Sequence, residues 1–145
     1  ASHDVPCLGY TLSAGGKSVS VVTDIGKVTP AVMKAITGSD LVVLESNHDA
    51  EMLKRNGKYS ELLKKRILSD KGHLSNDDCA ETACLLAASG TKQIILAHLS
   101  EENNCPELAF ETVCKKLESR GYAEGRDVKI DVAEQNALSA LYDIS

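Results

Sequence analysis

Three short hydrophobic runs in this chain each end on residues that can bind a metal ion or transfer a proton. The runs are rich in Val, Ile and Leu and lie at residues 19–22, 41–44 and 94–97. Short runs of this kind, separated by helix-like segments, predict buried strands of an α/β sheet. Because ligands bind beyond the carboxyl ends of such strands, we expect the residues that follow the runs to converge on one edge of the sheet. The key residues are Asp24, Glu45 and His98.

The remaining hydrophobic and polar pattern predicts a hairpin, several helices and a last strand. Residues 8–14 and 17–23 are expected to form two strands joined by Gly15 and Gly16, a strong hairpin signal. Capping residues and 3.6-residue periodicity predict helices at 31–36, 49–69, 75–89 and 106–120. The second of these is interrupted near Asn56 and Gly57. Residues 127–133 are expected to form the last strand, and the segment after residue 135 is unassigned.

Composition and cysteine usage indicate a cytoplasmic protein with one hydrophobic core. The 145 residues are sufficient for one such core, and no hydrophobic stretch approaches the roughly 18–20 residues that span a bilayer. Five cysteines form an odd set without a CxxC pair, which is typical of free thiols in a reducing cytosol. The net charge of −5 argues against a broad electrostatic grip on nucleic acid. Bound divalent metal ions could still supply a local positive field.

A basic segment follows the second hydrophobic run and has two interpretations. Its seven basic residues are Lys54, Arg55, Lys58, Lys64, Lys65, Arg66 and Lys71. A solvated helical face is the simpler interpretation, and a patch that faces phosphate beside the strand ends is the functional one.

The histidines lie in polar clusters, and taken singly each is more typical of a satisfied core or surface histidine than of a metal ligand. Asp24 and His98 have suitable chemistry for a divalent ion such as zinc or manganese. Two ligands do not complete a site, however, because catalytic zinc generally takes three protein ligands and a water. No HxH, HxxxH or HExxH motif is present to supply the others.

Four motifs in the chain resemble a known superfamily. They are VVTDIG around Asp24, LESNHD at 44–49, GHLSN at 72–76 and AHLS at 97–100. In this order they resemble the metallo-β-lactamase-fold phosphodiesterases, and most closely the bacterial WalJ (YycJ) group, described as metal-dependent DNA exonuclease-like proteins. The opening residues 3–10 also resemble the matching stretch of ribonuclease Z.

The resemblance implies a role for each matching residue. The aspartate at the place of Asp24 bridges two metal ions, and the histidine at the place of His98 binds one of them. Glu45 and His73 match a pair that assists proton transfer to the leaving oxygen. Residues at positions typical of the WalJ pattern or near phosphate are expected to bind substrate: Asn47, His48, Ser75 and Ser100.

The resemblance also implies a fold and a domain boundary. A full member is an αβ/βα sandwich of two sheets between helices, and residues 1–145 resemble its C-terminal half, a mixed sheet with helices on its outer face. The His-x-His-x-Asp-His metal motif belongs to the N-terminal half and is absent from this sequence. The chain also begins with Ala1 rather than methionine. We therefore expect a processed product or a piece of a longer protein.

These expectations favour a metal-dependent phosphodiesterase that acts on DNA ends and uses two zinc or manganese ions in the intact parent protein. One alternative is another hydrolase of the superfamily, acting on a thioester, a lactam or a small phosphodiester. The other is a non-catalytic fragment that binds no metal and associates with itself or with a partner chain. A sheet face left bare by the missing half predicts association with that half or self-association.

Overall fold

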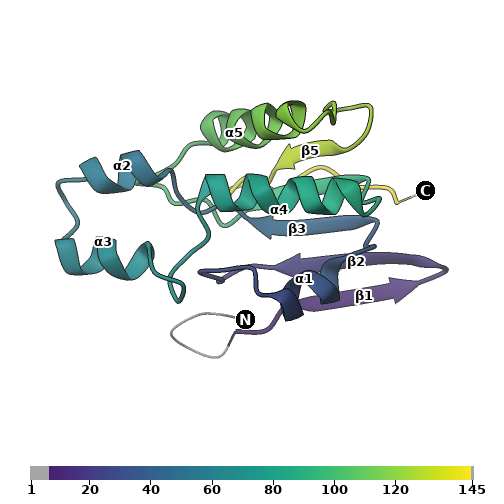
Figure 1. The fold of residues 1–145 in the computed structure, drawn as a ribbon, viewed down its shortest axis with the longest axis horizontal. Coiled ribbons are helices and arrows are strands. Elements are labelled where there is room, and N and C mark those ends of the chain that lie inside the picture. Colours follow the sequence, from purple (N-terminus) through teal and green to yellow (C-terminus); the bar gives the residue numbers. More distant parts are fainter. Residues whose placement is uncertain (1–6, 145) are drawn as a thin grey trace.

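The carboxyl ends of four parallel strands form one edge of the sheet in the computed structural model, which describes residues 7–144 (Figure 1). The five strands are β1 (Tyr10–Ala14), β2 (Lys17–Val22), β3 (Leu41–Glu45), β4 (Gln93–Ala97) and β5 (Lys129–Val132). The helices are α1 (Pro30–Ile36), α2 (Ala50–Arg55), α3 (Glu61–Ile67), α4 (Asn76–Ala88) and α5 (Pro106–Ser119). The strands lie in sequence order across the sheet. Only the pairing of β1 with β2 is antiparallel.

The tight turn between β1 and β2 depends on its two glycines. Gly15 and Gly16 have φ values of 58° and 78°, a conformation that other residues adopt at a steric cost. Two consecutive residues with positive φ are the requirement of a type I′ turn, whose twist matches that of the flanking strands. The predicted hairpin is confirmed.

Three helices cover one face of the sheet and form the core with it. Helices α1, α4 and α5 lie in front of the strands in Figure 1. Alternate strand residues on this face, among them Val42, Leu44, Ile94 and Leu96, are each 0% exposed. They pack in one cluster with Ile36 of α1 and with buried residues of α4 and α5. The predicted α/β class with helices on one side of a mixed sheet is confirmed.

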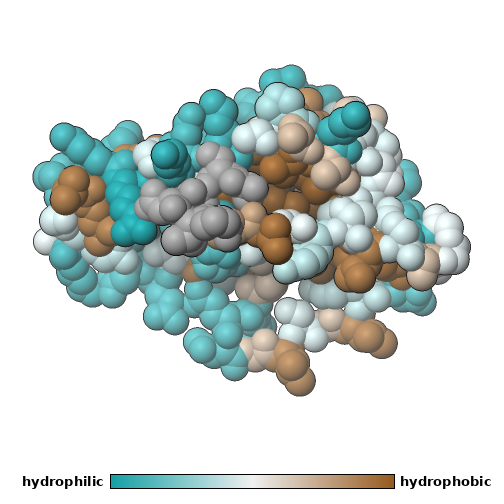
Figure 2. Space-filling view, turned by 90° about the horizontal axis from the view of Figure 1, so that it is seen from below, coloured by the Kyte–Doolittle hydropathy of each residue, from teal (hydrophilic) through white to brown (hydrophobic). Residues whose placement is uncertain are grey.

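The opposite face of the sheet is less covered. The strand register places Leu12, Val19 and Val21 on one face with Val43. Leu12 is 67% exposed, and the three valines are half-buried. Exposed hydrophobic side chains are also visible in Figure 2, which shows the molecule from the side of β1.

Consecutive residues of the hydrophobic runs lie on opposite faces of the sheet. Val42 and Leu44 lie on the helix-covered face, and Val43 lies on the other. A continuous hydrophobic run does not reveal which alternate residues point to which side, and the register with β2 decides it. Within residues 7–144, none of the helices is long and hydrophobic enough to cross a membrane.

The segment from residue 49 to residue 71 forms a separate helical lobe. Helices α2 and α3 lie beyond the carboxyl ends of β2, β3 and β4 (Figure 1). Asp49 and Ser60 cap the two helices with their side-chain oxygens. The expected interruption near Gly57 is confirmed, because it separates α2 from α3.

Candidate metal centre

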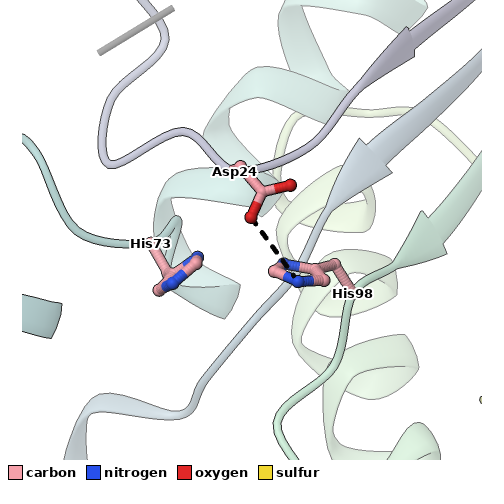
Figure 3. A group of neighbouring side chains, drawn as sticks. All are labelled: Asp24, His73 and His98. Carbon is pink, nitrogen blue, oxygen red and sulfur yellow. Dashed lines mark ion pairs between the residues drawn. The ribbon is translucent and has the colours of Figure 1, made fainter. Parts of the chain in front are cut away.

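Side chains from three strand ends meet at the carboxyl edge of the sheet. Asp24 follows β2, Glu45 is the last residue of β3 and His98 follows β4. The His98 Nε2 atom lies 3.7 Å from Asp24 Oδ1. His73, from the segment just before α4, lies beside them, and Figure 3 shows it with Asp24 and His98. The predicted convergence of Asp24, Glu45 and His98 is therefore confirmed.

Glu45 is the buried centre of this group. Its side chain is 0% exposed, and Oε1 lies 2.7 Å from His73 Nδ1 and 3.0 Å from His98 Nδ1. The backbone N–H of Ile25 donates to Oε2 at 2.7 Å. An ionised carboxylate only accepts hydrogen bonds, so both imidazoles donate through Nδ1. Glu45 and His73, which the resemblance pairs, are in direct contact.

The electrostatics of the group follow from these hydrogen bonds. Burial alone would raise the pKa of Glu45, but hydrogen bonds from His73, His98 and Ile25 outweigh it and hold the pKa below its ordinary value. The hydrogen bond to Glu45 raises the pKa of His98 against the opposing effect of burial, and Asp24 adds to the increase. The carboxylate is thus ionised at neutral pH.

Asp24, His73 and His98 have the geometry of a metal site. One ligand atom from each of these residues lies within 4.8 Å of the others. Because Glu45 binds Nδ1 of both histidines, Nε2 is the ring nitrogen that each can direct at an ion. A carboxylate behind a metal-binding histidine fixes the ring tautomer and raises its basicity. One Asp and two His ligands suit zinc and similar divalent ions, so the residues present fit a metal ion.

Two of these ligand candidates have an unusual backbone conformation. Asp24 and His98 have φ values of 56° and 60°, and they are the only non-glycine residues with positive φ in the described part of the chain. Such conformations cost free energy and concentrate at functional sites. Here they turn the chain abruptly at the ends of β2 and β4, next to the predicted ligand edge.

Two glycines allow the segment that carries His73 to approach the loop after Asp24. A Cβ atom on Gly26 would lie 2.5 Å from backbone atoms of Asp70 and Gly72. A Cβ atom on Gly72 would lie 2.1 Å from the carbonyl oxygen of Ile67. Backbone therefore packs against backbone directly beside His73, and this contact sets the distance of His73 from the strand ends.

Comparison with solved structures identifies the fold of the chain. The metallo-β-lactamase fold protein YhfI from Bacillus subtilis is similar, with a TM-score of 0.62 and 15% sequence identity over 91% of this chain and 42% of that protein. The fold is that of the metallo-β-lactamases. The ligand set at the strand ends is what indicates a divalent metal ion.

Comparison of sequences agrees with the predicted group within this fold. The chain is 40% identical over 130 residues to exodeoxyribonuclease YycJ of Bacillus anthracis, which is 89% of this chain and 49% of that protein. It is 39% identical over 144 residues to exodeoxyribonuclease WalJ of Streptococcus pneumoniae, which is 99% of this chain and 53% of that protein. The chain thus spans about half the length of these curated relatives. No protein-family profile matches it.

The predicted substrate-binding residues of this metallo-β-lactamase-fold chain make structural contacts around the metal centre. The Asn47 amide donates to the carbonyl oxygen of His98 at 2.8 Å and so holds that strand end. Ser75 caps α4 by accepting from the Asp78 N–H, and Ser100 accepts from the Asn103 N–H. Asn47 thus contacts the backbone of a ligand candidate, whereas Ser75 and Ser100 make local capping contacts. The roles of all three toward substrate stay predictions.

His48 differs from these residues because it is buried. The residue is 1% exposed, and neither ring nitrogen has a hydrogen-bond partner among residues 7–144. Burial lowers the pKa of His48, opposed in part by the charge of Glu45. Contact with a substrate would require the covering segments to move, so the predicted substrate-binding role of His48 also stays a prediction.

Sequence reasoning missed a buried amide network beneath the metal centre. Asn76 and Asn104 exchange two side-chain hydrogen bonds of 2.9 Å, and both are buried. The Ser46 hydroxyl donates to Asn76 Oδ1 at 2.7 Å, and the Asn104 amide donates to the Ser46 carbonyl at 2.8 Å. The network joins the end of β3 to the starts of α4 and α5. The polar residues after each strand were the available signal, but their partners are distant in sequence.

The likeness of residues 3–10 to ribonuclease Z rests partly on residues 3–6, which lie outside the described residues. It therefore stays a prediction.

Proposed function

We propose that this chain belongs to a metal-dependent phosphodiesterase that hydrolyses DNA from its ends. The observation that carries the proposal is the buried Glu45 carboxylate, which holds His73 and His98 beside Asp24. The names of the WalJ and YycJ relatives support exodeoxyribonuclease activity as the substrate assignment. They make DNA a better supported substrate than a thioester, a lactam or a small phosphodiester.

The proposed metal content is two divalent ions, zinc or manganese, which Asp24 and His98 would help to hold. Such ions would stabilise the negative charge that develops at phosphorus and supply an activated water at neutral pH. The proposed ligands on this chain are Asp24 and His98. His73 would be a third ligand if it bound metal instead of acting as the general acid. We propose that the other ligands lie in the remaining half of the fold, of which residues 1–145 form the C-terminal half.

His73 would protonate the leaving oxygen while Glu45 keeps its ring oriented. The hydrogen bond of 2.7 Å to His73 Nδ1 directs Nε2 away from Glu45, and His73 is 25% exposed and so reachable by a substrate. A positioned general acid of this kind contributes about 10²–10⁴-fold in rate. Asn47, Ser75 and Ser100 would position phosphate around this group.

Replacement of His73 tests the role of this residue. In the protein that includes the remaining half of the fold, His73→Ala should reduce the rate of DNA hydrolysis by about 10²–10⁴-fold and leave the metal content unchanged. Metal content is measured by elemental analysis and turnover by release of nucleotides from end-labelled DNA. His98→Ala is the matched control, because it should lower metal content. Loss of metal from the His73 variant would show that His73 is a ligand and not the general acid.

The open face of the sheet supports a proposal about partners. The partner expected there is the remaining half of the fold, because the relatives are about twice as long as this chain. The isolated chain would instead cover this face by self-association. A cytoplasmic location is proposed from the five cysteines, which are all free, with two of them buried.

A further inference from the structure

The helical lobe at residues 49–71 has a charge opposite to that of the rest of the chain. It contains seven basic and four acidic residues, a formal charge of +3. The whole chain has a formal charge of −5, so the remainder has −8. In Figure 1 this lobe, made of α2 and α3, lies beyond the strand ends that carry the metal centre. A concentration of positive charge at this position is a feature of phosphate recognition.

The lobe is attached to the loops of the metal centre at several points. The Asp49 N–H donates to the Asn103 carbonyl oxygen at 2.9 Å, and the Asn56 amide donates to Asn103 Oδ1 at 2.7 Å. Lys27, three residues after Asp24, pairs with Asp70 at 3.2 Å. These contacts hold the charged residues of the lobe in position relative to Asp24 and His98.

The basic residues of the lobe divide into paired and unpaired side chains. Lys54 and Lys58 pair with Glu51 and Glu102, both at 2.8 Å. A further three basic residues are exposed and make no ion pair within residues 7–144. They are Arg55, Lys65 and Lys71. Unpaired exposed cations can bind phosphate without first breaking an internal ion pair.

The neighbouring hollow beside the metal centre has the opposite character. A groove of about 670 Å³ lies between the segment that joins β4 to α5 and residues 132–136 at the end of β5. Glu101, Glu107 and Glu134 line it, and none of its lining residues is basic. Phosphate is disfavoured there, so a polyanion that reaches the metal centre is expected to extend over the lobe instead.

We propose that the lobe binds the sugar-phosphate backbone of the DNA strand whose end lies at the metal centre, through Arg55, Lys65 and Lys71. This inference rests on the proposed function, because it names the surface that holds the substrate. The contacts are electrostatic and independent of base sequence, so the lobe fixes the strand without selecting a sequence. An exonuclease that degrades any sequence requires a surface of this kind.

The test measures DNA binding by residues 1–145 and by a charge-reversal variant. The variant combines Arg55→Glu, Lys65→Glu and Lys71→Glu. Binding is followed by fluorescence anisotropy of a labelled 20-nucleotide single strand of DNA over a range of salt concentrations. Binding by the variant should be at least about tenfold weaker at low salt. The slope of log K against log salt should fall in magnitude by about 2, since each single-strand phosphate contact contributes about 0.7. A second variant, Lys65→Gln with Lys71→Gln, should show a smaller change in the same direction and serves if the triple variant does not fold.

The matched control reverses three exposed lysines away from the lobe, Lys34, Lys92 and Lys115, with the same change in net charge. Its DNA affinity should stay within about threefold of that of the unmodified chain. The proposal would be overturned if both triple variants bound DNA equally weakly, or if neither bound it more weakly than the unmodified chain. It would also be overturned if the unmodified chain did not bind DNA. Lobe-dependent binding to anionic phospholipid vesicles with no binding to DNA would also overturn it.

A second measurement separates this proposal from the proposed function. The metal-loaded protein with the remaining half of the fold is assayed with bis(4-nitrophenyl) phosphate, a diester too small to reach the lobe. The lobe variant should hydrolyse it at the unmodified rate. If the unmodified protein hydrolyses neither this small diester nor DNA, the proposed function is wrong, whatever the result of the binding experiment.

Discussion

Glu45 shows how one residue can determine the arrangement of a site. Its carboxylate is fully buried and accepts hydrogen bonds from two histidine rings and one backbone N–H. If one partner of a buried charged group is removed, a buried donor or acceptor is left without a hydrogen bond. This costs more free energy than the hydrogen bond itself contributes. The residue therefore stabilises the fold and fixes the ligand geometry at the same time.

A neutral isostere should separate these two effects. Glu45→Gln keeps the shape, but its amide N–H₂ would meet a histidine Nδ1–H donor or the Ile25 N–H. We expect a loss of about 2–3 kcal/mol in the free energy of unfolding at pH 7. Urea denaturation followed by circular dichroism measures it. Glu101→Gln, at an exposed position, is the control and should be close to neutral.

The effect of Glu45 on stability should also depend on pH. Because the folded-state pKa is lowered, its contribution is fully present above the ordinary value of 4.5 and is lost as the pH falls through the folded value. The difference between the unmodified chain and the Gln variant should thus shrink as the pH falls below 4.5 into strong acid. A difference that grows as the pH falls below 4.5 would contradict the assignment of an ionised carboxylate.

At the scale of elements, the segment from α3 to α4 positions His73. The His73 N–H donates to the Ile67 carbonyl at 3.1 Å, which folds the chain back on the last turn of α3. Gly72 lies in this turn against backbone atoms that cannot move independently. The glycine is required here because of close approach, and not because of its φ value.

A methyl group at this position should therefore disrupt the site. Gly72→Ala is expected to lower the free energy of unfolding by about 1–3 kcal/mol through overpacking. In the protein that includes the remaining half of the fold it should also slow DNA hydrolysis, because it displaces His73. Gly57→Ala is the matched control, since nothing lies within 4 Å of its added Cβ, and it should be neutral or stabilising by up to about 1 kcal/mol. Thermal unfolding measures the first effect, and release of nucleotides from end-labelled DNA measures the second. Equal behaviour of the two variants would show that the contact at Gly72 is relaxed in solution.

The sequence predicted the elements of this fold more completely than the contacts between them. Hydrophobic runs that end at Asp24, Glu45 and His98 predict a shared edge, because parallel strands bring their carboxyl ends together. The positive φ of Asp24 and His98 has no local signal, since neither residue is a glycine. The joint hydrogen bonds of Glu45 to His73 and His98 join residues 28 and 53 positions away. Such contacts depend on register and loop packing, which periodicity does not encode.

At the scale of the whole molecule, the two faces of the sheet differ in how well they are covered. Helices α1, α4 and α5 cover one face, where Leu44 and Leu96 are each 0% exposed, and the other keeps Tyr10 and Leu12 at 61% and 67% exposure. Burial of a large hydrophobic side chain is worth about 1.5–3 kcal/mol. A surface with several such residues favours association, and β1 is in addition an edge strand with backbone groups available for pairing.

We therefore expect the isolated chain to self-associate through the face that carries Leu12, Val19, Val21 and Val43. Light scattering coupled to size-exclusion chromatography should show a dimer or larger species that dissociates on dilution. Leu12→Lys should shift the population to monomer, because it places a charge in the centre of the buried contact. Leu62→Lys on α3, where the native leucine is 80% exposed, changes a similar side chain away from this face and should not alter the population. A monodisperse monomer at high concentration would contradict the prediction and show that the bare face is stable in water.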